Sequence, residues 1–494
     1  MSIVKPTDRA GERGVALVMA LLLVLAVSIV TGSLVVVARS EALSSLSYTS
    51  MSQVRYGAES GIHAAANYLL WTYASPSAAS ATDPFAAYDM SGSPVRLVAN
   101  GRPVVLSSDP AQSNYADAAV SLAFAQNSSG SLNVNGAPVA HTARAELIAM
   151  STVTDYYTQL PITLQTWRIT GVGSTTGSGQ SLVEVEAMIE RRPVPVFSYA
   201  AFATHNGCSA LNFAGGATTK SYDSGALVGG AAVVDDYGGN VGTNGNLDGN
   251  GGPTDINGTL STPRSGVGNC TSNNVTAATI SGWGTVEEGL VTLPQPVTLP
   301  TPTVPSPGAT DYSINSTNGC AGAPFCAVIA GKPTFIPNGA NPVSMGDVNL
   351  NGAAEVHLRA GTYQINSLKL AGNAKIVVDT GPVIIKVAGE GETTPIDLEG
   401  GGVSNPSLNP QNLQFVYAGT GNIKITGGTD TAALIYAPNA SAALSGSSTE
   451  FYGAIVTNKV TATGGFTLNY DRRLQNMVMT AGNPMMTSFT WKTF

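Results

Sequence analysis

Two acidic residues, Asp397 and Glu399, are the nearest approach to catalytic chemistry in this sequence. They stand two positions apart in Ile396-Asp397-Leu398-Glu399, so a strand there carries both carboxylates on one face. Paired carboxylates hydrolyse glycosides when they flank the bond at a suitable separation. Two solvated acids on a strand are nevertheless much commoner than a catalytic pair. A polysaccharide-active enzyme therefore remains only an alternative.

No other catalytic constellation accompanies this pair in the sequence. Neither a Gly-x-Ser-x-Gly nucleophile elbow nor a phosphate-binding P-loop is present. The four histidines are dispersed along the chain: His63, His141, His205 and His357. The residues therefore make no positive case for catalysis, and we expect that the protein is not an enzyme.

The segment that begins at Asn244 has the oxygen spacing of a calcium-binding loop. Side-chain oxygens fall at positions 1, 3, 5 and 12, which are Asn244, Asn246, Asp248 and Asp255, and a glycine falls at position 6. Positions 1 and 3 are neutral amides, position 12 is Asp rather than Glu, and no flanking helices are predicted. Turn formation is therefore the favoured interpretation, with calcium as the alternative and no other cofactor predicted. The adjacent Asp235 and Asp236 are either a second oxygen cluster or a solvated turn.

An apolar run near the N-terminus places the rest of the chain relative to a membrane. It extends for 24 uncharged residues from Val15 to Ala38 and ends at Arg39. That length spans a bilayer core of ~30 Å as a helix, and it exceeds the ~7–15 apolar residues of a cleaved secretory signal. The charges before the run, together with the free amino group, favour a cytoplasmic N-terminus and export of the bulk of the chain.

The cysteines all follow this run, on the predicted outer side of the membrane. They are Cys208, Cys270, Cys320 and Cys326. An even number in an oxidising compartment predicts two disulfides, for which three connectivities are open. We favour Cys320–Cys326 as a local loop and Cys208–Cys270 as a longer one. A zinc site would need Cys-x-x-Cys or nearby histidines, which the sequence lacks.

A helical pattern continues beyond the apolar run. No proline occurs from Val15 to Tyr73, and a helix of that length is ~88 Å long. After the run, apolar residues recur mostly at three- and four-residue steps, at Leu43, Leu46, Met51, Val54, Ala58, Ile62, Ala65 and Leu69. The spacing predicts one long helix, first in the membrane and then amphipathic, with its apolar face on a globular head.

Two motifs on this helix resemble the N-terminus of PilX-type minor pilins. Arg13-Gly14-Val15-Ala16-Leu17 is similar to the type IV prepilin signal, and Tyr56-Gly57-Ala58-Glu59-Ser60-Gly61-Ile62 resembles the Ala-Glu-Ser-Gly signature of that family. The resemblance implies cleavage by a prepilin peptidase between Gly14 and Val15. It also implies assembly with other pilins and minor pilins into a type IV pilus or related filament. A membrane-anchored surface protein outside a filament is the alternative.

The fifth residue after the implied cleavage departs from the major-pilin pattern. Major pilins usually carry a glutamate there, thought to pair with the amino terminus of a neighbouring subunit, whereas this chain has Met19. A missing glutamate is common among PilX-like and GspK-like minor subunits. The resemblance therefore implies a priming, tip or accessory subunit, and leaves open a pilus or a secretion pseudopilus.

The composition indicates a β-rich protein exposed outside the cytoplasm. Only 11% of the 494 residues are charged, 56 are glycine, and the formal net charge is −8. Abundant glycine with few charges is typical of short strands joined by tight turns. The negative charge and the absence of a Lys/Arg cluster argue against nucleic acid as a partner.

Two β-rich regions follow the helix. Thr163–Thr170 and Leu182–Ile189 flank a predicted hairpin loop at Gly171–Gly179, in a sheet that would cover the helix. A new region begins near Val196, and in its last third, from Val356 to Ala454, apolar alternations recur at roughly ten-residue intervals with Gly, Asn, Asp or Pro between them. This spacing is compatible with a sandwich, a barrel or a β-solenoid. Brief corners such as Ala371–Ala374 favour a right-handed β-helix among these folds. The ending at Asn469–Leu474 resembles that of large domains attached to PilX-type N-termini.

The sequence thus predicts an α+β fold in four parts. These are a prepilin leader at 1–14, a transmembrane and amphipathic pilin helix at 15–73, a pilin-like β head at 74–195, and a β-solenoid-like domain at 196–494 with a Pro-rich crossing at 293–307. The expected location is a single pass of the inner membrane with the bulk in the periplasm, and then the pilus or cell surface. The β-rich domain would serve adhesion, with a surface or a polysaccharide as its ligand.

Overall fold

One long helix opens the described part of the chain in this computed structural model. The helix α1 spans Glu12–Asn67 and continues directly into a π-helix, η1 (Tyr68–Thr72). Val15–Thr72 is long and apolar enough to cross a membrane, by length and composition. The predicted continuous helix is thereby confirmed. The structure describes residues 12–75, 85–158, 161–175, 181–266, 268, 270, 276–280, 284–315, 319–320, 322–337, 342–426, 431–446, 449–477, 479–482 and 484–493.

The chain divides into two compact units, and the fold class is α+β. The first unit comprises Met1–Ser151, Leu164–Arg191 and Pro484–Phe494, and the second comprises Thr152–Thr163 and Arg192–Asn483. This division differs from the predicted boundaries at both ends of the second region. The last residues return to the first unit, which the local pattern of the sequence did not predict.

The first unit is built on an antiparallel sheet, here called the head sheet. Its strands run in the order β3-β5-β6-β7-β37, with β4 also paired to β5. The bounds are β3 (Val105–Ser107), β4 (Gly130–Val134), β5 (Ala137–Thr154), β6 (Pro161–Thr175), β7 (Leu182–Glu190) and β37 (Met485–Thr493). Smaller elements complete the unit: β1 (Tyr88–Asp89), β2 (Arg96–Leu97), η2 (Pro110–Gln112) and α2 (Ala118–Asn127).

The predicted hairpin is confirmed, but its loop is shorter than expected. Strands β6 and β7 pair from Thr166↔Glu190 to Ser174↔Leu182. Residues 171–175 therefore belong to a strand, and the loop prediction for them was wrong. The C-terminal strand β37 then pairs with β7 from Met485↔Glu190 onward. Pairing of this kind joins residues far apart in the sequence.

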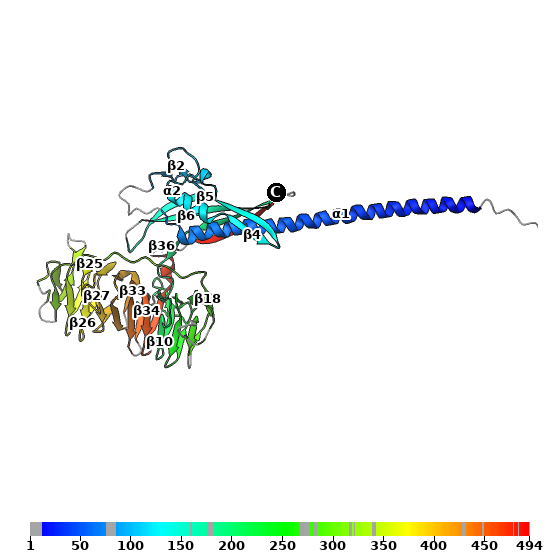
Figure 1. The fold of residues 1–494 in the computed structure, drawn as a ribbon. Helices are drawn as coiled ribbons and strands as arrows, with labels where there is room; N and C mark the ends of the chain where they lie inside the picture. Colours follow the sequence, from blue (N-terminus) through cyan, green and yellow to red (C-terminus); the bar gives the residue numbers. More distant parts are fainter. Residues whose placement is uncertain are drawn as a thin grey trace, which may run out of the picture. The chain divides into compact units, whose positions relative to one another are not determined.

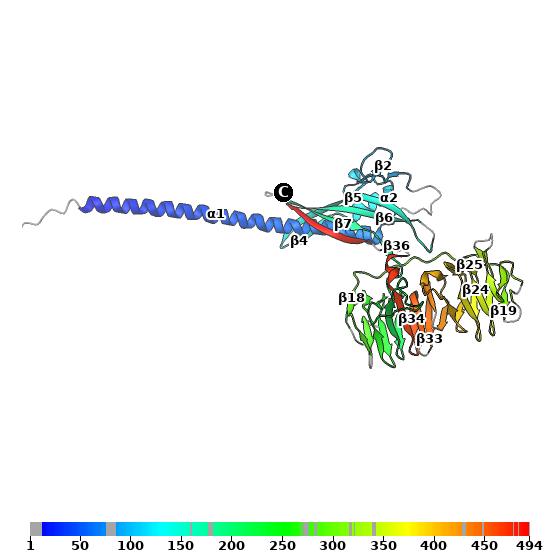
Figure 2. The ribbon, with the colours of Figure 1, turned by 180° about the vertical axis from the view of Figure 1, so that it is seen from behind.

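The second half of α1 packs on the head sheet. Its buried face consists of Val54, Ala58, Ile62, Ala65 and Leu69, and Figure 2 shows this part of the helix lying along the strands of its own unit. The same predicted face also included Leu43 and Leu46, which are 58% and 66% exposed. The helical spacing was correct, but the sheet covers only the later turns.

The second unit contains mostly short parallel strands, here called the parallel β domain (Ala201–Asp471). Its first strands are β9 (Ala201–Ala203), β10 (Leu211–Ala214), β11 (Thr218–Tyr222), β12 (Val241–Thr243), β13 (Leu247–Asn250), β14 (Thr254–Ile256), β15 (Leu260–Thr262), β16 (Ala278–Ile280), β17 (Gly284–Val286) and β18 (Leu290–Thr292). Each strand pairs in parallel with the third strand after it: β10 with β13 and β13 with β16, β11 with β14 and β14 with β17, and β12 with β15 and β15 with β18.

The same spacing recurs in the later part of this domain. Its strands are β19 (Tyr312–Ile314), β20 (Cys326–Ile329), β21 (Lys332–Phe335), β22 (Val343–Ser344), β23 (Asp347–Leu350), β24 (Glu355–Leu358), β25 (Gly361–Ile365), β26 (Ser367–Leu370), β27 (Lys375–Val378), β28 (Val383–Val387), β29 (Ile396–Leu398), β30 (Val403–Ser404), β31 (Leu413–Tyr417), β32 (Asn422–Thr426), β33 (Ala432–Ser445), β34 (Glu450–Ala462) and β35 (Thr467–Asp471). Strand β23 pairs with β26, β26 with β29, and β29 with β32, all in parallel.

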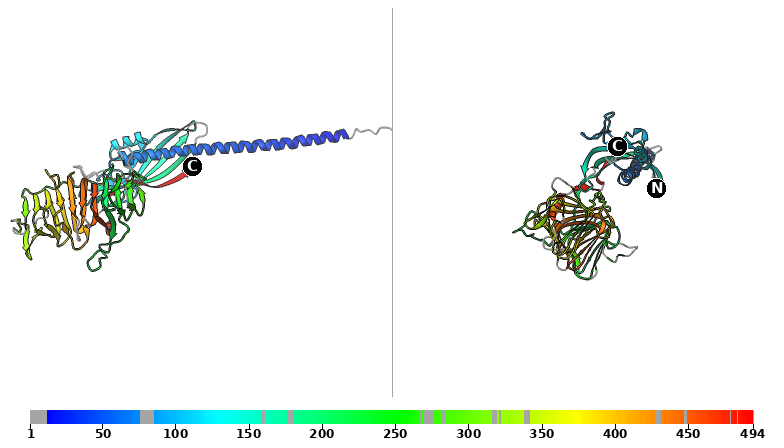
Figure 3. Two further views of the ribbon diagram at one scale, coloured as in Figure 1. Left: turned by 90° about the horizontal axis from the view of Figure 1, so that it is seen from below. Right: turned by 90° about the vertical axis from the view of Figure 1, so that its left-hand side faces the viewer.

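The two parts of the domain meet through strands far apart in the sequence. The late strands β34 and β35 pair in parallel with the early strands β9, β10 and β11. Figure 1 shows the consequence, with β33 and β34 lying between β26 and β10, and Figure 3 shows the strands side by side along the domain. Residues 293–307 link the parts without helix or strand, and Tyr436 donates a hydrogen bond to the Pro300 carbonyl at 2.5 Å.

The interior of the parallel β domain is packed with apolar side chains. Inward positions alternate along the strands and are buried, as at Val356 and Leu358, and at Ile376 and Val378. These positions match the alternation predicted from the sequence. A cavity lined by Tyr363 and neighbouring apolar side chains has a volume of only about 20 Å³, so this part of the interior has room for no more than about one water molecule.

The remaining elements are short. Strands β8 (Pro193–Pro195) and β36 (Met479–Ala481) pair antiparallel in the second unit. The 3₁₀ helices η3 (Pro410–Asn412) and η4 (Arg472–Asn476) are each capped by the side chain of the residue before them, Asn409 and Asp471. Such caps satisfy backbone N–H groups at the start of a helix.

Candidate functional site

The most conspicuous functional surface is the exposed apolar half of α1. Large apolar side chains from Val15 to Val37 are each more than half exposed. A soluble surface rarely exposes such a stretch, so a membrane or another protein has to cover it. The hydroxyls of Ser28, Thr31 and Ser33 donate hydrogen bonds to helix carbonyls of the preceding turn. These three side chains therefore present no unpaired hydroxyl on the exposed apolar surface.

The predicted processing residues lie at the start of this surface. Gly14 belongs to the first turn of α1, Val15 is 63% exposed, and Met19 is 67% exposed. Met19 lies among other apolar side chains and presents no charge to a neighbour. The N-terminal amine of another subunit would therefore find no carboxylate at this position.

Four glycines bring α1 unusually close to the head sheet. A Cβ on Gly57 would lie 2.5 Å from Val139 Cγ1, and one on Gly61 would lie 2.6 Å from the Thr142 carbonyl oxygen. On the sheet side, a Cβ on Gly171 or Gly173 would overlap the helix carbonyls of Ala58 and Val54. The contact therefore requires residues without side chains on both partners.

This contact gives a structural role to the motif Tyr56–Ile62. Its two glycines face β5 and β6, and Glu59 forms an ion pair with Arg55 one turn earlier, with Nε and Oε1 2.9 Å apart. Sequence reasoning recognised the helix glycines but assigned Gly171 and Gly173 to a loop. The signal that could have found them is a Gly-x-Gly at strand spacing opposite a Gly-x-x-x-Gly at helix spacing.

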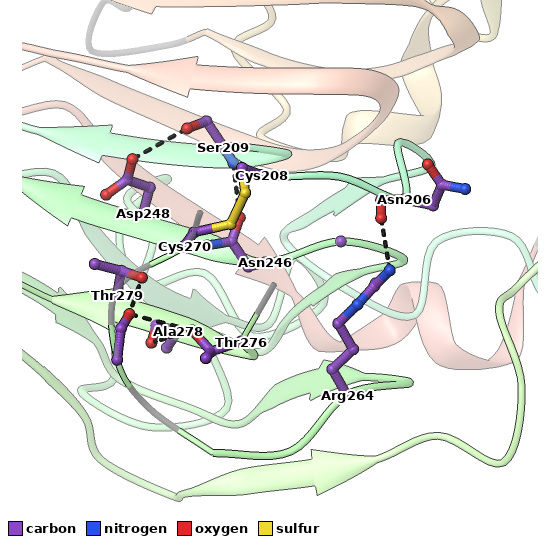
Figure 4. The surroundings of a disulfide bond; sticks show 12 residues. Asn206, Cys208, Ser209, Asn246, Asp248, Arg264, Cys270, Thr276, Ala278 and Thr279 are labelled. Atoms are coloured by element: carbon purple, nitrogen blue, oxygen red, sulfur yellow. Dashed lines mark hydrogen bonds between the residues drawn. A yellow bond between two sulfur atoms is a disulfide. The ribbon is translucent and has the colours of Figure 1, made fainter. Parts of the chain in front are cut away.

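Both disulfides join the cysteines in the favoured pairing. Cys208 bonds Cys270, with their Cα atoms 5.9 Å apart, and Cys320 bonds Cys326 at 5.5 Å. Figure 4 shows the first bond between the start of β10 and the segment before β16. In the same region, Arg264 donates to the Asn206 carbonyl at 2.7 Å.

The residues of the predicted calcium loop are engaged in other contacts. Asn244 donates to the Val297 carbonyl and accepts from the Val297 N–H, both at 2.8 Å. Asn246 and Asp248 accept hydrogen bonds from the Ser209 N–H and hydroxyl at 2.7 and 3.0 Å (Figure 4). Asp255 lies on the separate strand β14. These contacts support the turn-forming interpretation. In the described part of the chain, no group of three or more His, Cys, Asp or Glu could hold a metal ion.

The other acidic pairs are parts of ion-pair networks. Asp235 Oδ2 lies 2.6 Å from Arg472 Nη1, and Asp236 Oδ1 lies 2.7 Å from Lys220 Nζ. Asp397 lies in register between Lys369 and Lys424 on neighbouring strands. Glu399 Oε2 lies 3.1 Å from Lys424 Nζ and raises the pKa of that lysine. The positions of Asp397 and Glu399 are therefore explained by charge pairing with the lysines of neighbouring strands.

A charged cluster around His357 was missed by sequence reasoning. Glu355 accepts from His357 at 3.1 Å and pairs with Lys375 at 3.0 Å and Lys332 at 3.3 Å. The other ring nitrogen of His357 lies 2.5 Å from Asp379. These residues come from the three strands β21, β24 and β27, with Asp379 directly after β27, so the signal is visible only once these strands are aligned.

We predict that the ion pairs of Glu355 in this cluster stabilise the folded protein near neutral pH and lose this contribution in acid. Hydrogen bonds from Lys375 and then His357 lower the pKa of Glu355 from 4.5 to about 2. Because the folded pKa is depressed, the stabilisation is complete above about pH 4.5 and is lost as the pH falls toward about 2. The lysines are more than 40% exposed, so we expect roughly 1 kcal/mol.

Denaturant titrations of the wild type and of Glu355→Gln measure this effect. The difference between them should be present near neutral pH and should vanish in strong acid. Glu399→Gln is the matched control, because Glu399 pairs with a single, exposed lysine. A Glu355→Gln deficit that persists unchanged below about pH 2 would contradict the assignment.

One comparison with known proteins gave a match. A family model described as a domain of unknown function (DUF7305) matches residues 343–477. No curated protein and no solved structure matches the chain. The matched residues run from β22 to the end of η4, within the parallel β domain. The later part of that domain, together with its closing strands β34 and β35, is therefore similar to a domain for which no function is described.

Proposed function

We propose that this chain is a PilX-type minor pilin-like subunit of a type IV pilus or related filament. The observation that carries the proposal is the division of α1 into an exposed apolar half and a half seated on an antiparallel sheet through the glycines of Tyr56–Ile62. An assembly of such subunits would bury the exposed half against neighbouring helices. Before assembly, the same half would hold the chain in the inner membrane.

We further propose that the parallel β domain is a right-handed β-helix displayed for adhesion. Parallel pairing of every third strand supports this winding. One row of outward side chains crosses neighbouring strands in register: Asn349, Lys369, Asp397, Lys424, Ala443, Thr461, Asn212, Asp248 and Thr279. Apart from Ala443 the row is polar, and its repeat at the ~4.8 Å strand spacing suits a repetitive surface or a polysaccharide.

Processing by a prepilin peptidase tests the filament proposal directly. Coexpression with the peptidase should give a mature N-terminus at Val15, measured by mass spectrometry. Gly14→Val should leave Met1 in place, because the resemblance requires glycine before the cleaved bond. Gly32→Ala is the matched control, since a Cβ there meets nothing within 4 Å. A wild-type chain that keeps Met1 in the presence of active peptidase would rule the proposal out.

A membrane-anchored surface protein outside a filament is the second candidate. Met19 favours it, because an exposed methionine offers no charge to the amine of a neighbouring subunit. Affinity capture of the full-length protein from detergent-solubilised cells separates the candidates. If pilin subunits are recovered with the wild-type protein, the result supports a filament subunit. If they are recovered only with the Met19→Glu variant, the result supports a membrane-anchored surface protein outside a filament.

A further inference from the structure

A segment of the second unit covers part of the outer face of its strands. This segment, residues 223–237, is here called the strap. Its Leu227, Ala232 and Val234 pack against a small buried cluster formed by Tyr222, Leu408, Ala432 and Tyr452. The strap therefore shields from water Tyr222 of β11, Ala432 of β33 and Tyr452 of β34.

Two polar side chains of β35, in register with Tyr452 and Tyr222 of this cluster, are buried without satisfying all of their hydrogen bonds. Asn469 and Asp471 are each 1% exposed, and they alternate with the core residues Leu468 and Tyr470 on β35. Neither the oxygen nor the nitrogen of the Asn469 carboxamide has a hydrogen-bond partner, and Asp471 Oδ2 has none either. Leaving such groups unpaired costs free energy, so a buried carboxamide with both atoms unpaired calls for an explanation.

A lysine is the direct neighbour of this carboxamide. The parallel register of β11 and β35 places Lys220 opposite Asn469, and Tyr452 of β34 lies opposite Asn469 on the other side. Neighbouring strands are only ~4.8 Å apart, which is well within the reach of a lysine side chain. Lys220 Nζ is 2.7 Å from Asp236, but the Asp236 side chain is 73% exposed. An exposed pair of this kind contributes little and is readily exchanged.

We propose that Lys220 and Asn469 join through an intramolecular isopeptide bond, with Asp471 as the group that transfers protons. The Lys220 ammonium leaves Asp236 and gives one proton to solvent. The resulting neutral amine attacks Cγ of Asn469, a new Cγ–Nζ bond forms, and the Cγ–Nδ2 bond breaks. One lysine proton passes by way of Asp471 to the leaving nitrogen, which departs as ammonia. No oxidant, reductant or cofactor is consumed.

The surroundings of Asp471 suit this role. Its Oδ1 is held by the N–H groups of Ser224 and Arg473, both at 3.2 Å, while Oδ2 remains unpaired. Burial raises the pKa of Asp471, and the nearby Asp223 raises it further, against those hydrogen bonds. A carboxyl that keeps its proton can polarise the Asn469 carbonyl. Tyr222, opposite Asp471, and Tyr452 help to exclude water.

The bond would lie where the two ends of the parallel β domain meet. Strand β11 belongs to the first strands of the domain, and β35 is its last. A covalent link between them would reinforce a joint that is otherwise held by strand pairing and non-covalent side-chain contacts. The bond would form whether or not the chain enters a filament, because all of the groups involved belong to the second unit.

Peptide mass spectrometry of the purified full-length protein tests the proposal. Digestion should release one branched peptide that contains both Lys220 and Asn469, lighter than the sum of its parts by one ammonia. Lys220→Arg and Asp471→Asn should each give linear peptides, and Lys332→Arg should leave the branched peptide in place as a matched control. Only linear peptides from folded wild-type protein would overturn the bond. A branched peptide that persists in Asp471→Asn would overturn the role of Asp471.

Discussion

Replacing Gly173 by valine is expected to detach α1 from the head sheet, with a loss of about 3 kcal/mol of stability in the first unit. A Cβ at this position would overlap the Val54 carbonyl oxygen and lie 2.6 Å from the Ala58 N–H nitrogen. Both are backbone atoms of a helix, so neither side can yield by changing a rotamer. Fluorescence-monitored unfolding reports on this unit, because Trp167 is 2% exposed in its core.

Gly92→Val is the matched control for this experiment. Gly92 belongs to the same unit, and a Cβ there meets nothing within 4 Å. Its replacement should change stability by no more than about 0.5 kcal/mol, as for an ordinary surface site. Equal stabilities of the Gly173→Val and Gly92→Val proteins would show that the close helix–sheet approach is not required.

Removing the Cys208–Cys270 disulfide is expected to cost about 4 kcal/mol of stability in the second unit. The reason is the length of chain that the bond closes, since its cysteines are 62 residues apart. The chain-entropy relation gives only about 2 kcal/mol for Cys320–Cys326, whose cysteines are 6 residues apart. Thermal unfolding of the two double Cys→Ser variants in detergent measures the difference.

The two disulfide variants control for each other, because each removes one bond and adds two hydroxyls. A larger loss from the Cys320/Cys326 variant would contradict the chain-entropy argument. It would indicate instead that the short loop closed by Cys320–Cys326, which ends at the first residue of β20, stabilises the folded domain more than its length predicts. Addition of a reductant to the wild type should reproduce the sum of both losses.

The helix–sheet contact also connects stability with the proposed function. If α1 docks into a filament, its exposed half and its buried half must keep a fixed direction relative to the head sheet. The four glycines permit that direction because they lack side chains at the points where the helix and the sheet approach most closely. A variant that loosens the contact would therefore lower the amount of subunit in filaments even where processing at Gly14 is normal.

Local patterns in the sequence determined a large part of this protein. The uncharged run from Val15 to Ala38 predicted the exposed half of α1, and steps of three and four residues predicted its buried face from Val54 onward. Alternation at period two located the β6–β7 hairpin and the short strands of the later chain. These signals are readable because helix and strand periodicity depends on neighbouring residues alone.

Tertiary structure alone decided which strands became neighbours. Nothing in the local pattern indicates that β37 pairs with β7, or that β35 pairs with β11 and places Lys220 beside Asn469. The glycines at 171 and 173 have turn-forming composition, yet they lie in a strand because α1 needs their missing side chains. Pairing and close approach depend on which distant surfaces meet. That information is spread over the whole chain, so short-range periodicity does not reveal it.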